Sequence, residues 1–142
     1  MGPDQHILLV EDDAATRQGL TILLEGVGYH VAGAANGREA LDYLRQAEPP
    51  LVILTDLSMP VMDGWRFRHE QRRDPALALI PVVVLSGEGD LPRVAAGLGV
   101  AGHLPKPVEF TELLATLRVL GEESPAANAP RQEEGHGTRV VP

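Results

Sequence analysis

Cysteine is absent from this 142-residue sequence, which excludes disulfide bonds and cysteine-ligated zinc. Aromatic residues make up only 4% of it, so a hydrophobic core has to be built mainly from Leu, Val, Ile and Ala. The apolar runs are too short to cross a bilayer, and the first residues lack the charged start and cleavage site of a signal peptide. We therefore expect a cytoplasmic protein without membrane contact.

Basic residues are also scarce, with 12 Lys and Arg against 20 Asp and Glu and a net charge of -8. This balance argues against direct nucleic-acid binding, which needs clustered positive charge, and it suits a protein that holds a cation. The length and the 44% content of apolar residues predict one domain with a substantial core.

Five short runs have the character of strands. The first is continuously apolar, as in a strand buried on both faces, and the second and fifth are weaker or shorter. These runs are His6–Glu11, Tyr29–Ala34, Leu51–Asp56, Ile80–Ser86 and Ala101–Pro105. The segments that follow them have the apolar spacing of helices, and most begin at a residue that can cap a helix. We expect caps at Asp13, Asn36, Asp63 and Asp90, and a last helix from Phe110 to Gly121.

The first and third of the predicted helices differ in their apolar faces. Four apolar residues share one face of the first helix: Leu20, Leu23, Leu24 and Val27. The third helix, from Asp63 to about Arg73, has Trp65 and Phe67 as its only large apolar residues. The sequence therefore predicts a first helix with one clear apolar stripe and a weakly amphipathic third helix.

Strands that alternate with helices predict an α/β fold, in which a parallel sheet is covered by helices on both faces. We expect a flavodoxin-like (βα)5 three-layer sandwich with a five-stranded parallel sheet in the order 2-1-3-4-5. Residues 5–121 would form this domain. Residues 122–142 have no helical or strand period and are expected to be a disordered C-terminal tail or a linker to an output domain.

Polar side chains follow four of the five predicted strands. They are Glu11, Asp12 and Asp13 after the first strand, Asp56 at the end of the third, Ser86 at the end of the fourth and Lys106 after the fifth. Because the carboxyl ends of parallel strands meet at one edge, these groups should converge. Grouped carboxylates recruit a hard cation such as Mg²⁺. A nucleophilic Asp56 beside that cation, a lysine and a hydroxyl would suit phosphoryl transfer.

Each of these residues alone has a more ordinary interpretation. An aspartate at a strand end is usually a helix cap or a turn residue, and the three acidic residues could be the solvated start of a helix. A serine often ends a strand, and a lysine is usually on the surface. The combination at the ends of four strands is what favours a phosphoryl site.

Four segments resemble the receiver domain of two-component response regulators, over about residues 5–121. They are "ILLVEDD", "DLSMPVMDG", "VVVLSG" and "HLPKPV". The resemblance implies that Asp56 is the phosphoacceptor and that Ser86 and Lys106 contact the phosphoryl oxygens. It implies Mg²⁺, with Mn²⁺ as an alternative, bound by Asp12 and Asp56, by the Ser58 carbonyl and by Glu11 through water. Asp13 is then a helix cap, and the Lys106–Pro107 peptide bond would be cis.

The resemblance also implies a switch and a control of the phosphoryl lifetime. Ser86 and His103 would move together on phosphorylation, unless His103 is simply a surface histidine on an edge strand. An imidazole at this position would make the switch sensitive to pH, which conformational populations measured from about pH 5.5 to 8 would test. Ser58 and Glu88 would tune dephosphorylation. The segment from Ser86 to Lys106 is about two residues shorter than the family pattern and rich in glycine. The family binds partners or dimerises through this face, so the resemblance does not by itself imply the family's usual dimer.

The implied function is a phosphoacceptor signalling domain rather than an enzyme, apart from its own phosphorylation and autodephosphorylation. Its partners would be a sensor histidine kinase or a histidine phosphotransfer protein and an unknown downstream protein, with a phosphorylation-dependent homodimer as an open alternative. A phosphatase of the haloacid-dehalogenase type is disfavoured, because Asp56-Leu57-Ser58 breaks its Asp-x-Asp pattern. A scaffold that works without phosphate is disfavoured by the intact set of Asp56, Ser86 and Lys106.

Overall fold

The computed structural model describes residues 6–87 and 89–123, along which strands and helices alternate as predicted. The strands are β1 (His6–Val10), β2 (His30–Ala34), β3 (Val52–Thr55), β4 (Val82–Ser86) and β5 (Gly102–Pro105). The helices are α1 (Ala14–Gly26), α2 (Gly37–Gln46), α3 (Gly64–Arg73), α4 (Leu91–Leu98) and α5 (Phe110–Glu123). None of the helices within these described ranges is both long and apolar enough to cross a membrane.

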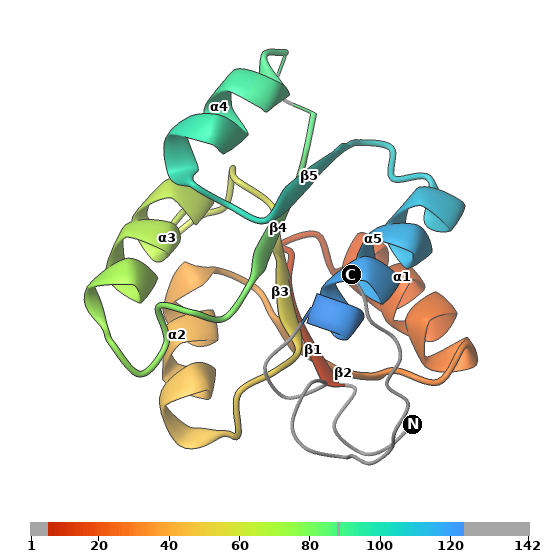
Figure 1. Ribbon diagram of the computed structural model, residues 1–142, viewed down its shortest axis with the longest axis horizontal. Coiled ribbons are helices and arrows are strands. Elements are labelled where there is room, and N and C mark those ends of the chain that lie inside the picture. Colours follow the sequence, from red (N-terminus) through yellow and green to blue (C-terminus); the bar gives the residue numbers. More distant parts are fainter. Residues whose placement is uncertain (1–5, 88, 124–142) are drawn as a thin grey trace.

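The five strands form one parallel sheet in the order β2-β1-β3-β4-β5, which confirms the predicted order. Val10 pairs with Ala34 on one side and with Thr55 on the other, while Ser86 pairs with Pro105. Helices α1 and α5 cover one face of the sheet, and α2, α3 and α4 cover the other (Figure 1). This is the predicted three-layer sandwich, and its strands end together at one edge.

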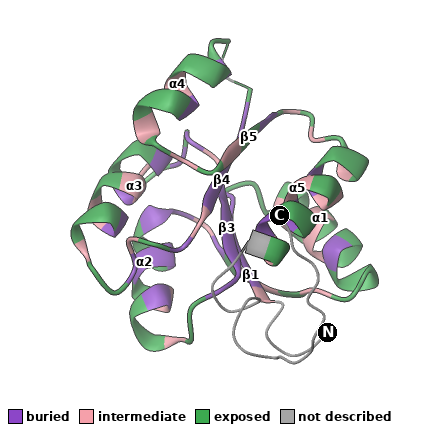
Figure 2. Cartoon of the chain, in the orientation of Figure 1, coloured by how far each residue is buried: buried purple, intermediate pink, exposed green. Residues whose placement is uncertain are grey.

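Each face of the sheet has its own hydrophobic core, because successive residues of a strand point to opposite faces. Leu8, Ile53 and Phe67 are fully buried in the core under α2, α3 and α4. Ile7 and Leu54 are fully buried in the core under α1 and α5. The central strands are the most buried part of the chain (Figure 2), so the residues that follow them are held at a rigid sheet edge.

Three caps were predicted correctly and one was not. Asp13, Asn36 and Asp63 accept hydrogen bonds from the backbone N–H of the third residue after them, as capping residues do. Asp90 occupies the cap position of α4, but its side chain makes no capping bond. It forms an exposed ion pair with Arg93 instead, at 3.3 Å.

Two helices differ in detail from their sequence patterns. The predicted apolar stripe of α1 lies on a helix, but only Leu24 of its residues is fully buried, and Leu23 and Val27 are 49% and 52% exposed. The 3.6-residue period identifies a helix, whereas the width of its buried face depends on the neighbouring elements. Helix α5 was predicted to end at Gly121 and runs to Glu123, so residues 122 and 123 are helical. The rest of the predicted tail, 124–142, lies outside the described residues.

The polar helix α3 is anchored by polar contacts as well as by Phe67. Gln71 is fully buried and donates from Nε2 to the carbonyls of Leu77 and Ile80, at 2.8 and 3.1 Å. Burial of an amide is tolerated when its hydrogen bonds are made in this way. These bonds explain how a helix with a weak apolar stripe packs against the sheet.

Helix α3 also holds the C-terminal end of α4. Arg68 donates from Nε to the Leu98 carbonyl at 3.0 Å and from Nη2 to the Gly99 carbonyl at 2.7 Å. Arg72 lies 3.4 Å from the same Leu98 carbonyl. The last carbonyls of a helix have no partner within it and sit at the negative end of its dipole, so cationic donors stabilise them.

We expect Arg68→Ala to loosen the end of α4 without unfolding the domain. The Gly99 amide, which donates to Ala95 at 3.1 Å, should exchange its hydrogen at least about tenfold faster, because the loss of even one bond from a charged donor costs about 1.5 kcal/mol. Hydrogen exchange followed by NMR measures this. Arg66→Ala is the matched control, since Arg66 makes only an exposed pair with Glu70. Equal exchange rates in the two variants would contradict the anchoring role.

Candidate functional site

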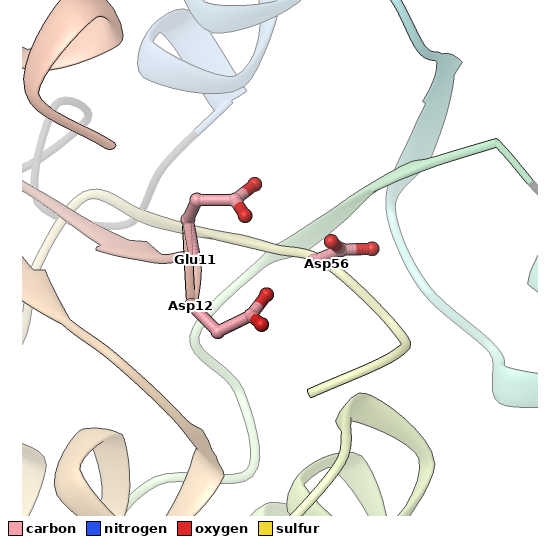
Figure 3. A group of neighbouring side chains, drawn as sticks. All are labelled: Glu11, Asp12 and Asp56. Atoms are coloured by element: carbon pink, nitrogen blue, oxygen red, sulfur yellow. The ribbon is translucent and has the colours of Figure 1, made fainter. Parts of the chain in front are cut away.

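Three carboxylates gather at the sheet edge, at the carboxyl ends of β1 and β3. Glu11 and Asp12 follow β1, and Asp56 follows β3. One carboxylate oxygen of each lies within 4.8 Å of the others (Figure 3), and such a group can hold a metal ion. Glu11 is 2% exposed, whereas Asp12 is open to solvent. The predicted convergence of these residues is confirmed, and the donor set of hard oxygens favours Mg²⁺ or a similar cation.

Lys106 links two of these carboxylates. Its Nζ donates to Oε1 of Glu11 at 2.7 Å and to Oδ2 of Asp56 at 2.8 Å. Burial alone would lower the pKa of Lys106, but the hydrogen bonds and charges of Asp56 and Glu11 outweigh it and raise that pKa above its ordinary value. Lys106 is therefore protonated at neutral pH, and its positive charge offsets the repulsion between the carboxylates. The Lys106–Pro107 peptide bond is cis, as the resemblance implied.

The phosphoacceptor candidate Asp56 is held at both carboxylate oxygens. Oδ1 accepts from the Leu57 N–H at 2.7 Å, and Oδ2 accepts from Lys106. Its backbone is held too, because Asp56 N donates to the Val10 carbonyl and its own carbonyl accepts from the Thr55 hydroxyl at 2.8 Å. The side chain is 13% exposed, so it can still be reached from solvent.

The other polar residues that the sequence places near the site differ in their positions. Ser86 is buried at the end of β4, and its carbonyl accepts from the Lys106 N–H at 2.9 Å. Ser58 is exposed, two residues after Asp56. Asp13 caps α1 through Thr16, whose hydrogen bonds lower the pKa of Asp13, and it is not among the clustered carboxylates. Glu88 lies outside the described residues.

His103 lies away from the carboxylates, in the middle of the edge strand β5. Its side chain is exposed and lines a groove of about 670 Å³ between α4, β5 and α5. The position fits both alternatives left open by the sequence, a switch residue and a surface histidine on an edge strand.

Two glycines let the loop after β3 pack closely against its surroundings. A β-carbon on Gly64 would lie 2.8 Å from Cα of Leu57 and would also collide with the Asp56 carbonyl. A β-carbon on Gly37 would lie 2.8 Å from Cγ of Met62, and the Gly37 N–H donates to the Met62 carbonyl at 2.8 Å. The starts of α3 and α2 thus fix the course of the loop that carries Asp56.

Val61, at the tip of this loop, has the left-handed backbone conformation, with φ of 70°. That region costs a residue with a β-carbon about 1–2 kcal/mol, and β-branched residues are least suited to it. The side chain is 81% exposed, so burial does not offset this cost. A locally strained turn therefore follows the phosphoacceptor candidate.

Val61→Gly is expected to raise the free energy of unfolding by about 0.5–1 kcal/mol. The gain is smaller than the strain, because glycine also increases the entropy of the unfolded chain. Urea denaturation measures the change. Val61→Ala, which keeps the β-carbon, is the control and should gain less. A Val61→Gly variant less stable than the wild type would show that the turn is not strained.

Some residues at the site were not found by sequence reasoning. Thr55 and Arg17 both bind backbone carbonyls there, the first that of Asp56 and the second that of Glu11. A threonine inside a strand and an arginine on a helix carry no signal of such contacts in the sequence.

Comparison with known proteins gives a consistent result. Residues 7–118 match the family described as "Response regulator receiver domain". Response regulator MprA of Mycolicibacterium vanbaalenii is 39% identical over 117 residues, which are 81% of this chain and 49% of that protein. The DNA-binding response regulator MtrA of Mycobacterium tuberculosis is 37% identical over 116 residues, 80% of this chain and 49% of that protein. The chain thus spans about half the length of the curated relatives it matches.

Solved structures show the same fold. The chemotaxis response regulator CheY4 of Vibrio cholerae is 33% identical, with a TM-score of 0.73, and the match covers 81% of this chain and 97% of that one. The signal receiver domain of a histidine kinase from Syntrophus aciditrophicus is 28% identical, with a TM-score of 0.76 and coverage of 95% and 99%.

Proposed function

The chain belongs to the response regulator receiver domain family, and on that premise we propose that Asp56 accepts a phosphoryl group from a phosphohistidine of a partner protein. The observation that carries this proposal is the convergence of Asp56, Glu11, Asp12 and Lys106 at one sheet edge. The cluster provides a nucleophile and a cation site whose carboxylate oxygens lie within 4.8 Å of one another, and a positive charge that is hydrogen-bonded to Glu11 and Asp56. Receiver domains are signalling domains, and this set of groups is what such a transfer needs.

In the proposed reaction an oxygen of the Asp56 carboxylate attacks phosphorus. A P–O bond forms and the P–N bond to the partner's imidazole breaks. The second nitrogen of that imidazole carries a proton before the transfer, so the ring leaves in its neutral form. The phosphoryl group then carries its charge on three oxygens. Lys106, which donates a hydrogen bond to Asp56 in the structure, would donate to one of those oxygens, and the Ser86 hydroxyl would donate to another.

The cation proposed for the site is Mg²⁺, with Mn²⁺ able to use the same ligands. Glu11, Asp12 and Asp56 fit it, because they offer only carboxylate oxygens, and the Ser58 carbonyl would be a further ligand. When bound, the ion supplies positive charge that neutralises the phosphoryl oxygens as the transfer proceeds. Lys106 balances the charges of Glu11 and Asp56 in the structure described here.

The output is proposed to pass through the face formed by α4, β5 and α5. Ser86 would move toward the phosphoryl group and the ring of His103 would turn inward, which would change the groove that His103 lines. A downstream protein, or a second copy of the chain, would recognise the altered face. Any DNA binding, as the printed name of MtrA states for that protein, would belong to a further domain in a longer protein. Hydrolysis of the acyl phosphate would return the domain to its first state, at a rate tuned by Ser58 and Glu88.

Incubation with acetyl phosphate tests the proposal. We expect one phosphoryl group per chain in the presence of Mg²⁺ and none when EDTA removes the metal, measured by intact-protein mass. Continuous turnover of small phosphomonoesters would favour a phosphatase of the haloacid-dehalogenase type instead. No modification under either condition would favour a scaffold that works without phosphate.

A further inference from the structure

Arg17, in the second turn of α1, reaches back to the end of β1. Its Nη1 donates to the backbone carbonyl of Glu11 at 2.6 Å. The backbone N–H of Glu11 donates to the Ala34 carbonyl at 2.9 Å and continues the hydrogen-bond ladder between β1 and β2. Arg17 therefore binds the polypeptide at the point where β1 ends and the two acidic residues begin.

Gly33 provides the space through which the Arg17 side chain passes. A β-carbon built on Gly33 would lie 3.2 Å from Cδ, 3.6 Å from Nε and 3.7 Å from Cγ of Arg17. The φ of Gly33 is not positive, so the backbone conformation does not require glycine here. The close approach of the arginine is what a side chain at this position would disturb.

The side chain of Glu11 is held at both carboxylate oxygens. Its Oε2 accepts from the Asp13 N–H at 3.0 Å, and its Oε1 accepts from Lys106. The carbonyl bond to Arg17 fixes the peptide that joins Glu11 to Asp12, and this peptide sets how the two carboxylates face Asp56. Contacts that orient metal ligands from behind typically change metal affinity by about 10- to 100-fold.

We propose that Arg17, seated on Gly33, is a positioning residue for the cation site formed by Glu11, Asp12 and Asp56. The inference rests on the proposed function, since it assumes that the three carboxylates bind Mg²⁺. Arg17 does not touch the carboxylate oxygens. Arg17 acts through the backbone of Glu11. Its loss should therefore change the affinity for Mg²⁺ rather than the phosphoryl transfer itself.

The charge of Arg17 and its contact with the Glu11 carbonyl predict opposite changes in Mg²⁺ affinity when Arg17 is replaced. A positive charge close to the cluster repels Mg²⁺, so loss of the charge alone would tighten binding. Loss of the carbonyl contact would weaken binding, because the Glu11–Asp12 peptide is freed. The sign of the change in Mg²⁺ affinity therefore decides between the two.

The test is a calorimetric titration of the full chain with Mg²⁺, with no phosphate present. Arg17→Ala should weaken binding about tenfold. Gly33→Ala keeps the charge and displaces the side chain, and it should weaken binding by about threefold or more. The double variant should bind no more weakly than Arg17→Ala, because both changes break one contact. Gly19→Ala, on α1 with open space around it, is the matched control and should bind as the wild type does.

Each outcome separates this inference from the proposed function. If the wild type does not bind Mg²⁺, the proposed function fails. If the wild type binds and either Arg17→Ala or Gly33→Ala binds as tightly or more tightly, the positioning role is wrong. At saturating Mg²⁺ the variants should take up phosphoryl groups from acetyl phosphate at the rate of the wild type, within about twofold. A loss that saturating Mg²⁺ does not restore would also overturn the inference.

Discussion

Gly64→Ala is expected to destabilise the domain by about 3 kcal/mol or more and to displace Asp56. The added β-carbon would lie 2.8 Å from Cα of Leu57 and closer still to the Asp56 carbonyl, and both are backbone atoms that cannot swing aside. Overpacking of this kind typically costs about 1–3 kcal/mol, and the cost rises when backbone has to move. The free energy of unfolding from urea denaturation measures the first effect, and uptake of phosphoryl groups measures the second.

Gly97→Ala is the matched control for this change. Gly97 lies in α4, and a β-carbon there would meet nothing within 4 Å. Alanine in a helix should be more stable than glycine by about 0.5–1 kcal/mol, so the two variants should differ in sign. If Gly64→Ala unfolds at the same urea concentration as the wild type, then the loop after β3 is not held by this close approach.

Lys106→Met is expected to cost about 2 kcal/mol of stability in buffer without divalent metal. Met fills a similar volume, but it removes the cation between Glu11, which is buried, and Asp56. Breaking a buried pair on one side costs about 3–5 kcal/mol, and the partial exposure of Lys106 reduces this figure. Mg²⁺ should stabilise the variant more than the wild type, because the ion replaces the lost charge without competition from the lysine.

Arg93→Met is the control for Lys106→Met. Its pair with Asp90 has side chains that are 86% and 65% exposed, so its loss should change stability by less than about 0.5 kcal/mol. Equal effects of the two substitutions in metal-free buffer would mean that Lys106 does not balance the charges of the carboxylates.

The ion pairs of Lys106 with Glu11 and Asp56 also predict how the stability of the domain depends on pH in the alkaline range. The pKa of Lys106 is raised in the folded protein, so its contribution is complete below the unfolded value of about 10.4. That contribution is lost as the pH rises through the higher folded-state pKa. The difference in stability between the wild type and Lys106→Met should therefore be constant from neutral pH to about pH 9 and shrink above about pH 10.4. A difference that persists through the alkaline range would contradict the pairing.

The architecture and the core of the site follow from local patterns in the sequence. Doubly buried strands, helical spacing and capping residues such as Asp13 and Asn36 each act over a few residues, and the rule for parallel sheets then brings Asp56 to the acidic pair. What could not be predicted depends on contacts between distant segments. The exposure of Leu23, the burial of Gln71 and the contact from Arg68 to Gly99 arise from packing that no local pattern encodes.

At the site, too, some residues follow from local sequence patterns and others depend on contacts between distant segments. Glu11, Asp12, Asp56 and Lys106 could be placed because each ends a strand or follows one, and their chemistry explains why they belong together. Arg17 and Gly33 could not, because their role depends on a 2.6 Å contact to a backbone carbonyl and on the absence of a β-carbon. Contacts that use the backbone are open to many side chains, so the identity of the residue does not reveal them.

The central claim is that Asp56 is the acceptor, and the most direct measurement compares two aspartate variants. Wild type, Asp56→Asn and Asp13→Asn are incubated with acetyl phosphate and Mg²⁺, and the phosphoryl content of each chain is measured by mass. Asp13 lies close by but caps α1, so its variant controls for the loss of one carboxylate. We predict one phosphoryl group in the wild type and in Asp13→Asn and none in Asp56→Asn. A phosphoryl group on Asp56→Asn would contradict the account.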